Sequence, residues 1–213
     1  MKILIYGTKS SAKFIAETIS ESHNFEILGF IGNEKESKEL FNKKIFQDYY
    51  FLGTLKDVDH LKKLHEDLKG FIVGVGDPIL KEDIYYELEN TGLISVNAIS
   101  NKSSIAKDVK IGTGTVVGNG SIISSGTIIG NNTFVGSNTA IEYGVNISDN
   151  CIIRSSCVIG ASSSIMRCVS INSSSVIYPE INIGKNQQID EGSIIKKDKK
   201  SLIKKSIWSK RLY

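Results

Sequence analysis

An aliphatic residue stands at every sixth position across most of the second half of this chain. The run begins at Ile105 and ends at Ile195 without a slip, and it contains fourteen isoleucines and two valines. A period of six matches neither an amphipathic α-helix, which repeats about every 3.6 residues, nor the two-residue alternation of an ordinary strand. It is typical of a parallel β-helix built from hexapeptide repeats. We therefore predict that this part of the chain folds into such a coil.

Each hexad is expected to supply one short strand and one corner, so that three hexads close one triangular turn. Sixteen hexads give about five turns, and no insertion interrupts them to form an extruded loop. The residue four positions after each aliphatic one is usually small or β-branched, and we expect it to face the narrow interior. Cys151 and Cys157 occupy this position, which favours a packing role over catalysis or metal binding.

The first hundred residues alternate between strand-like and helix-like segments. Short apolar runs at residues 2–6, 25–31, 71–75 and 95–96 predict strands, whereas residues 12–19, 58–68 and 79–88 have apolar residues at helical spacing. This alternation predicts a small Rossmann-like parallel sheet covered by helices. The chain is thus expected to comprise an α/β domain at residues 1–100, a β-helix at 101–200 and a basic tail or cap at 201–213.

Three glycine-containing polar segments follow the predicted strands, at residues 7–11, 32–33 and 76–77. In parallel sheets, ligands bind at the carboxyl ends of the strands, where helix N-termini offer free N–H groups to anions. One interpretation is that a phosphate-bearing ligand binds at this end of the predicted sheet. Ordinary turn chemistry is the other, because Gly, Ser, Asn and Asp are common in turns.

The composition excludes several classes of protein. With 40% hydrophobic and 23% charged residues, the chain is not expected to be disordered. Its three cysteines lack CxxC spacing, so we expect them to be reduced. Its start lacks a signal-peptide core, and no apolar run is long enough to enter a membrane. We therefore expect a cytoplasmic protein. Residues 196–213 contain eight Lys or Arg and one Asp, which accounts for the net charge of +3 and argues against a broad nucleic-acid-binding face.

Four short segments in this arrangement point to a family. They are ILIYG at residues 3–7, LGFI at 28–31, FIVGVGD at 71–77 and IE at 141–142. A Rossmann-like unit followed directly by a hexapeptide β-helix resembles the bacterial sugar acyltransferases of the NeuD–PglD type, and among them the UDP-amino-sugar N-acetyltransferases. The resemblance covers nearly the whole chain. It implies a left-handed β-helix, a homotrimer with active sites between neighbouring prisms, and acetyl-CoA-dependent acetyl transfer, without a metal, to the amine of a nucleotide-linked amino sugar in bacterial glycan biosynthesis.

The same resemblance implies a set of site residues. The nucleotide-linked sugar would contact Gly7, Lys9, Ser10, Ser11, Gly32, Asn33 and Gly76. Acetyl-CoA would contact Ile152, Ser173, Glu191, Lys204 and Lys205. The catalytic stretch would fall on Glu142 and Tyr143. The chain departs from the family pattern at the first loop, which keeps only its first glycine, and at residues 32–33, where Gly-Asn replaces Asp-Asp.

The family's catalytic signature is a Glu–His pair in which the histidine deprotonates the sugar amine, but here Tyr143 and Gly144 follow Glu142. The three histidines lie within residues 1–100, where surface or capping roles are expected for His23, His60 and His65. A general base contributes about 10²–10⁴-fold to a rate. Two hypotheses therefore stand: an acetyltransferase that works without a histidine base, and a catalytically silent homologue that serves as a binding or assembly scaffold. A γ-type carbonic anhydrase shares the prism but needs zinc-binding histidines, and residues 105–213 contain none.

The basic tail has three interpretations. Its apolar residues have helical spacing and would let it cover the last open turn of the coil, whose exposed strand edge otherwise invites pairing. The family resemblance would instead place its lysines near the phosphates of CoA. Contact with a membrane surface or a nucleic acid is the third interpretation.

Overall fold

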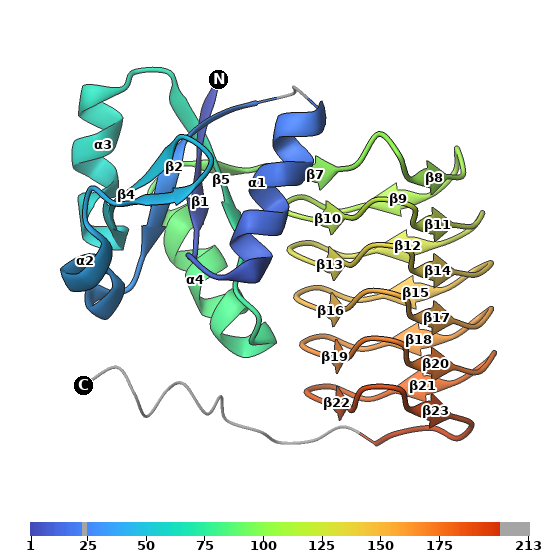
Figure 1. Ribbon diagram of the computed structural model, residues 1–213. Coiled ribbons are helices and arrows are strands. Elements are labelled where there is room, and N and C mark those ends of the chain that lie inside the picture. Colours follow the sequence, from blue (N-terminus) through green and yellow to red (C-terminus); the bar gives the residue numbers. More distant parts are fainter. Residues whose placement is uncertain (23–24, 201–213) are drawn as a thin grey trace.

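The computed structural model describes residues 1–22 and 25–200, which form an α/β part followed by a β-helix (Figure 1). No helix in these described ranges is long and apolar enough to cross a membrane. The α/β part contains β1 (Lys2–Tyr6), α1 (Ser10–Ser22), β2 (Glu26–Gly32), α2 (Glu34–Leu40), β3 (Lys44–Phe46), β4 (Tyr49–Thr54), a 3₁₀ turn at Leu55–Asp57, α3 (Val58–Leu64), β5 (Leu68–Val73), α4 (Pro78–Asn90) and β6 (Ile94–Ser95).

The α/β part has a six-stranded sheet in the order β3-β4-β2-β1-β5-β6, parallel except for the β3–β4 pair. Alternate residues of β1 face opposite sides of the sheet. Ile3 and Ile5 belong to the cluster that contains α1, whereas Leu4 and Tyr6 belong to the cluster that contains α3 and α4. Both faces of the strands are therefore buried, which explains why the sequences of these strands are continuous apolar runs. The predicted parallel sheet covered by helices is confirmed.

Several local features differ from the sequence-based expectation. Strands β3 and β4 were not predicted. Helix α2 was not predicted because none of its residues is buried, so it carries no apolar periodicity. A capping box between Asn33 and Glu36 holds its start, and this Asn-x-x-Glu pattern was the available signal. Helix α3 ends at Leu64 rather than at residue 68, because Leu68 already begins β5 and packs in the sheet core.

The β-helix consists of two-residue strands that form three parallel sheets (Figure 1). The first sheet contains β7 (Ala98–Ile99), β10 (Val116–Val117), β13 (Phe134–Val135), β16 (Ile152–Ile153), β19 (Ser170–Ile171) and β22 (Gln188–Ile189). The second contains β8 (Ser104–Ile105), β11 (Ile122–Ile123), β14 (Ala140–Ile141), β17 (Val158–Ile159), β20 (Val176–Ile177) and β23 (Ile194–Ile195). The third contains β9 (Lys110–Ile111), β12 (Ile128–Ile129), β15 (Asn146–Ile147), β18 (Ser164–Ile165) and β21 (Asn182–Ile183).

Each strand pairs with the strand three hexads away, as in the register Ile123↔Ile141. The predicted hexapeptide coil is confirmed, and its topology is consistent with a left-handed β-helix. The coil begins one hexad earlier than the predicted run, at Ile99 in β7. We call the turn from the first to the second sheet the first corner, that from the second to the third the second corner, and that from the third back to the first the third corner.

The interior of the prism is filled as the repeat predicts. The aliphatic column from Val117 to Ile195 is buried. The small or β-branched residues four positions later are buried from Ser121 to Ser175, and they include Cys151 and Cys157. Buried hydroxyls at this small position donate to carbonyls of the next turn, for example Thr115 Oγ1 to Gly130 O at 2.9 Å and Ser121 Oγ to Gly136 O at 2.8 Å. These bonds satisfy polar groups that would otherwise be costly to bury.

The α/β part packs on the outer face of the first sheet. Phe14 of α1 lies against Phe134, with ring centroids 5.2 Å apart, and Val116 and Ile152 join the same buried cluster. The outer faces of the second and third sheets have no such cover among the described residues (Figure 1).

Candidate functional site

The carboxyl ends of β2, β1 and β5 meet at one edge of the sheet, where the three predicted polar segments lie together. The amide of Gly7 donates to Ile31 O and the amide of Gly74 donates to Tyr6 O, each at 2.8 Å. Gly7 has φ +112°, and a Cβ there would lie 2.6 Å from Gly74 O. Only glycine fits this close approach, which explains why the loop keeps its first glycine.

The N-terminus of helix α1 lies at this edge of the sheet, which we call the rim. The amides of Ser10, Ser11 and Ala12 are the first three of the helix, so they have no intrahelical acceptor. Helix α4 differs, because Asp77 Oδ1 accepts from the amides of Ile79 and Leu80, both at 2.9 Å. Of these two helices, α1 is therefore the one whose first-turn amides can bind an anion at this rim.

A residue that the sequence analysis did not identify, Arg154, reaches the same rim from the first corner of the β-helix. A Cβ on Gly76 would lie 3.3 Å from Arg154 Nη2 and 4.0 Å from Ser11 Oγ, so three elements converge at this point. The Nε of Arg154 donates to Asn172 Oδ1 one turn below, at 3.1 Å, which orients the guanidinium. The available signal was an arginine directly after the aliphatic residue, where several other hexads have glycine.

The end of β2 carries a carboxylate that comes from α2. Asn33 Oδ1 accepts from the amide of Glu36 at 2.9 Å, so the predicted ligand residue Asn33 is used as a helix cap. The Glu36 carboxylate turns back to the rim, where Oε2 accepts from the amide of Asn33 at 3.0 Å and Oε1 accepts from Thr8 Oγ1 at 2.5 Å. The pKa of the nearby Tyr6 is raised by burial and by the negative charges of Glu36 and Glu87.

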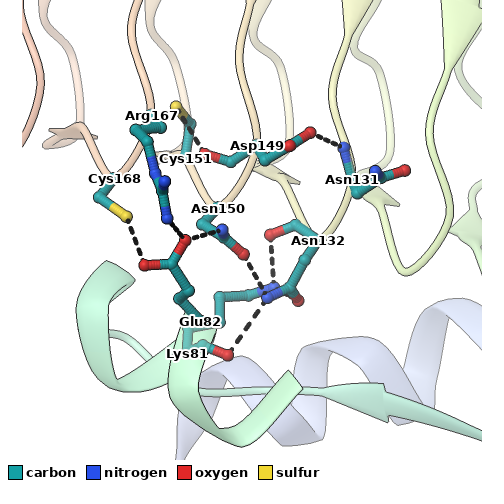
Figure 2. Close-up of polar contacts among 9 residues, drawn as sticks. All are labelled: Lys81, Glu82, Asn131, Asn132, Asp149, Asn150, Cys151, Arg167 and Cys168. Atoms are coloured by element: carbon teal, nitrogen blue, oxygen red, sulfur yellow. Dashed lines mark hydrogen bonds and ion pairs between the residues drawn. The ribbon is translucent and has the colours of Figure 1, made fainter. Parts of the chain in front are cut away.

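A buried polar network joins α4 to the third corner of the β-helix (Figure 2). Lys81 is fully buried, and its Nζ donates to both oxygens of Asn132, at 2.7 Å for the backbone carbonyl. Asn132 in turn donates to Lys81 O at 3.2 Å and to Asn150 Oδ1 at 2.8 Å. Burial lowers the pKa of Lys81 to about 7.

The next residue of α4, Glu82, extends this network. Its Oε1 accepts from Asn150 Nδ2 at 2.7 Å and from the guanidinium of Arg167 (Figure 2). Cys168 Sγ lies 3.6 Å from Glu82 Oε2. Because Gly76 directly precedes the cap of α4, these contacts fix the rim against the β-helix and therefore against Arg154.

The predicted catalytic stretch lies at the second corner, which joins the two sheets that the α/β part does not cover (Figure 1). Glu142 Oε2 accepts from the amide of Ala161 one turn below, at 2.9 Å. Tyr143 is 67% exposed, and Gly144 makes the turn at φ +66°. The rim lies at the first corner. One chain therefore does not bring the predicted catalytic and substrate-binding residues together.

The predicted acetyl-CoA contacts are also dispersed. Ile152 is only 2% exposed beneath the α/β part, so it is closed to a cofactor. Ser173 and Glu191 stack on the first corner one turn apart, and Gly192 N donates to Ser173 O at 2.9 Å. Lys204 and Lys205 lie outside the described residues, as does the rest of the predicted tail at 201–213.

The histidines are placed as expected where they are described. His60 is exposed on α3 and His65 ends that helix, whereas His23 lies outside the described residues. Within residues 1–22 and 25–200, no three His, Cys, Asp or Glu side chains gather to hold a metal ion.

Two hollows in the described part lie away from both halves of the predicted site. One, of about 150 Å³, lies between α4 and the third corner and is lined by residues such as Tyr86 and Asp149. The other, of about 410 Å³, lies near the first turn of the coil and is lined by residues such as Phe25 and Ile94. None of the predicted site residues lines either hollow.

Comparisons with known proteins agree with this architecture. Residues 2–88 match the family model described as the PglD N-terminal domain. PerB from Caulobacter crescentus, solved with CoA and GDP-perosamine, has a similar fold, with a TM-score of 0.76 at 15% identity over 95% of this chain and 92% of that chain. A mutant of perosamine N-acetyltransferase from Caulobacter crescentus, also solved with CoA and GDP-perosamine, gives 0.65 at 18% identity over 94% and 91%. No curated protein matches the sequence.

Proposed function

We propose that this chain is an acetyl-CoA-dependent N-acetyltransferase that acts on a nucleotide-linked amino sugar without a histidine base. One observation carries the proposal: an α/β part that matches the PglD N-terminal domain precedes a hexapeptide β-helix, in an arrangement similar to that of PerB with CoA and GDP-perosamine. The proposed roles are nucleotide-sugar binding by residues 1–100, acyl transfer on the coil at 101–200, and a cap or CoA contact by the tail at 201–213.

The rim is the proposed seat of the nucleotide diphosphate. The first-turn amides of α1 at Ser10 and Ser11, with Lys9 before them, offer donors and positive charge. Arg154 adds a guanidinium that contacts the rim from the β-helix. Arginine forms paired hydrogen bonds to phosphate oxygens, which makes it a strong determinant of position.

The chemistry at the second corner is acyl transfer. The neutral amine of the sugar attacks the thioester carbonyl, the carbon–sulfur bond breaks, and the CoA thiolate leaves and takes up a proton. The Glu142 carboxylate is the proposed acceptor of the amine proton, and its hydrogen bond from the amide of Ala161 holds it in place. Positioning of the two reactants supplies most of the rate, because orientation contributes about 7–11 kcal/mol. The loss of a histidine base removes about 10²–10⁴-fold.

The second sheet offers the surface on which a second copy of the chain would complete the site. Its outer face carries an apolar column of five residues, one in each successive turn: Ile122, Ala140, Val158, Val176 and Ile194. Ile122 is 54% exposed and Ile194 is 59% exposed. The third sheet has mostly polar residues at the equivalent positions, including Lys110, Asn146 and Asn182. Exposed apolar columns of this kind mark protein interfaces.

This apolar column runs between the first corner and the second corner. Arg154 and the rim border one side of it, and Glu142 and Tyr143 border the other. We propose a homotrimer in which the second corner of one chain faces the rim or the first corner of its neighbour. Acetyl-CoA would then lie between chains, with Ser173 and Glu191 along its path.

A direct assay decides between this activity and a catalytically silent scaffold. Purified protein is incubated with acetyl-CoA and a panel of nucleotide-linked amino sugars, and the acetylated product is measured by mass spectrometry. Turnover by the natural protein supports the proposal. Turnover only by the Tyr143→His variant, and not by Tyr143→Phe as its matched control, would show that the natural chain is silent.

A further inference from the structure

The coil fixes the backbone of Arg154, so the contact of this arginine with the rim depends on where the α/β part docks. The amide of Arg154 donates to Ile171 O in the following turn, at 2.9 Å. Cys151 and Ile153, just before it, are fully buried inside the prism. Arg154 therefore contacts Gly76 only if the α/β part meets this turn of the coil rather than a neighbouring one.

Apolar packing alone does not specify this docking position. The first sheet contributes apolar side chains to the cluster around α1 in three successive turns, through Val116, Phe134 and Ile152. The hydrophobic effect has no preferred direction, and the strands of neighbouring turns are arranged in the same way. A shift by one turn would still bury apolar side chains, but it would separate Gly76 from Arg154.

Glu82 of α4 distinguishes one turn from the others (Figure 2). Its Oε1 accepts from Asn150 Nδ2 at 2.7 Å and from the guanidinium of Arg167 in the following turn. The Glu82 side chain is only 14% exposed. A carboxylate that is largely removed from water needs such partners, because its desolvation is otherwise uncompensated. A shift by one turn would separate Glu82 from both of them.

The neighbouring turns offer Glu82 poorer partners. In the preceding turn, the equivalent positions hold Asn132 and Asp149, and the charge of the aspartate would repel the carboxylate. In the following turn they hold Cys168 and Lys185, and a thiol is a weaker donor than an amide. The side chains of the third corner therefore favour a single docking position for α4.

We infer that Glu82 is a positioning residue of the nucleotide site. It does not contact the nucleotide, but it selects the turn of the coil on which α4 docks and thereby holds Arg154 against the rim. The connection is short, because Gly76 directly precedes the cap of α4 and Asn150 lies on the same stretch of the coil as Arg154. This inference rests on the proposed function, since the nucleotide site is itself a proposal.

A double-mutant cycle tests this role, with the dissociation constants of UDP and GDP measured by calorimetry. Glu82→Ala should weaken binding about tenfold, as Arg154→Met should, because both remove the contact of Arg154 with the nucleotide. In the Arg154→Met background the same change should weaken binding by less than about twofold, because residues that act together have non-additive effects. Glu82→Gln should retain most of the affinity, because its amide oxygen can still accept from Asn150. Glu89→Ala, which removes an equal charge at an exposed position of α4, is the matched control and should leave binding unchanged.

A second variant approaches the same contact from the coil. Arg167→Met removes the ion pair without changing α4, so it tests the inference even if Glu82→Ala does not fold, and it should also weaken binding only when Arg154 is present.

The outcomes separate this inference from the proposed nucleotide site. If Glu82→Ala and Arg167→Met bind nucleotide as the natural protein does, or if their losses are equally large in the Arg154→Met background, the positioning role is wrong. The nucleotide site would still stand in both cases, provided that Arg154→Met alone weakens binding. If the natural protein binds neither UDP nor GDP, the inference and the proposed site are overturned together.

Discussion

Lys81 should make the stability of this protein depend on pH between neutrality and about pH 10. Its ammonium group is fully buried, and it donates to the oxygens of Asn132 rather than to a carboxylate. Burial opposes the charged form and lowers the pKa from 10.5 to about 7. Lys81→Met preserves the approximate length of the side chain and removes the charge.

The sign follows from proton linkage. The unfolded chain holds the Lys81 proton up to about pH 10.5, whereas the folded chain releases it near pH 7. The cost of burying the charge is therefore fully present below pH 7 and disappears as the pH rises to 10.5. A pKa lowered from 10.5 to about 7 corresponds to about 5 kcal/mol. The loss of the donor to Asn132 costs the variant about 1–3 kcal/mol at every pH.

Lys81→Met should accordingly be more stable than the natural protein by about 2–4 kcal/mol at pH 6, and less stable by about 1–3 kcal/mol at pH 10.5. Urea unfolding at pH 6, 8 and 10.5 measures both values and the crossover between them. Lys35→Met, an exposed position on α2, is the matched control and should show no such reversal. A free-energy difference between Lys81→Met and the natural protein that stays constant across this range would refute the reasoning.

Three further predictions concern other parts of the molecule. Arg154→Met should weaken binding of UDP or GDP by about tenfold or more, measured by calorimetry, because a charge-assisted hydrogen bond at the rim is lost; unchanged affinity would remove Arg154 from the site. Val158→Asp should convert a trimer into monomers in light scattering, whereas Asn146→Asp on the third sheet should not; a monomeric natural protein would contradict the interface. Ser156→Gly should stabilise the coil by about 1 kcal/mol in urea unfolding, because Ser156 has φ +62°, and a destabilised variant would argue against strain there.

The coil could be predicted from the sequence because every hexad carries the same pattern of aliphatic and small residues. Whether residue 123 or residue 177 is considered, the aliphatic side chain points inward, and the small residue four positions later fits the interior. The α/β part was predictable for a similar reason, since strands buried on both faces are continuous apolar runs. Helix α2 lacked any such pattern and is specified by its cap alone.

The site was harder to predict because it depends on which corner the α/β part meets. Nothing in the period distinguishes Arg154 from another corner residue, and only the packing of α1 on the first sheet brings it to Gly76. Lys81 illustrates the same limit. Lysine is almost never fully buried, and its partner Asn132 lies 51 residues away in the chain, so local sequence gave no reason to place it inside.

Because the rim and Glu142 lie at different corners of the coil, the proposed nucleotide binding and the proposed turnover can be tested independently. The proposed nucleotide site needs only groups that a single chain already brings together, namely α1, the loop at Gly76 and Arg154. The proposed turnover needs Glu142 or Tyr143 as well, and these lie beyond the apolar column at the opposite corner of the second sheet. A variant held as a monomer should therefore bind the nucleotide with natural affinity and yet form no acetylated product. Turnover by such a monomer would mean that the reacting groups lie elsewhere on one chain, and the assignment of Glu142 would then be wrong even if the fold and the substrate were right.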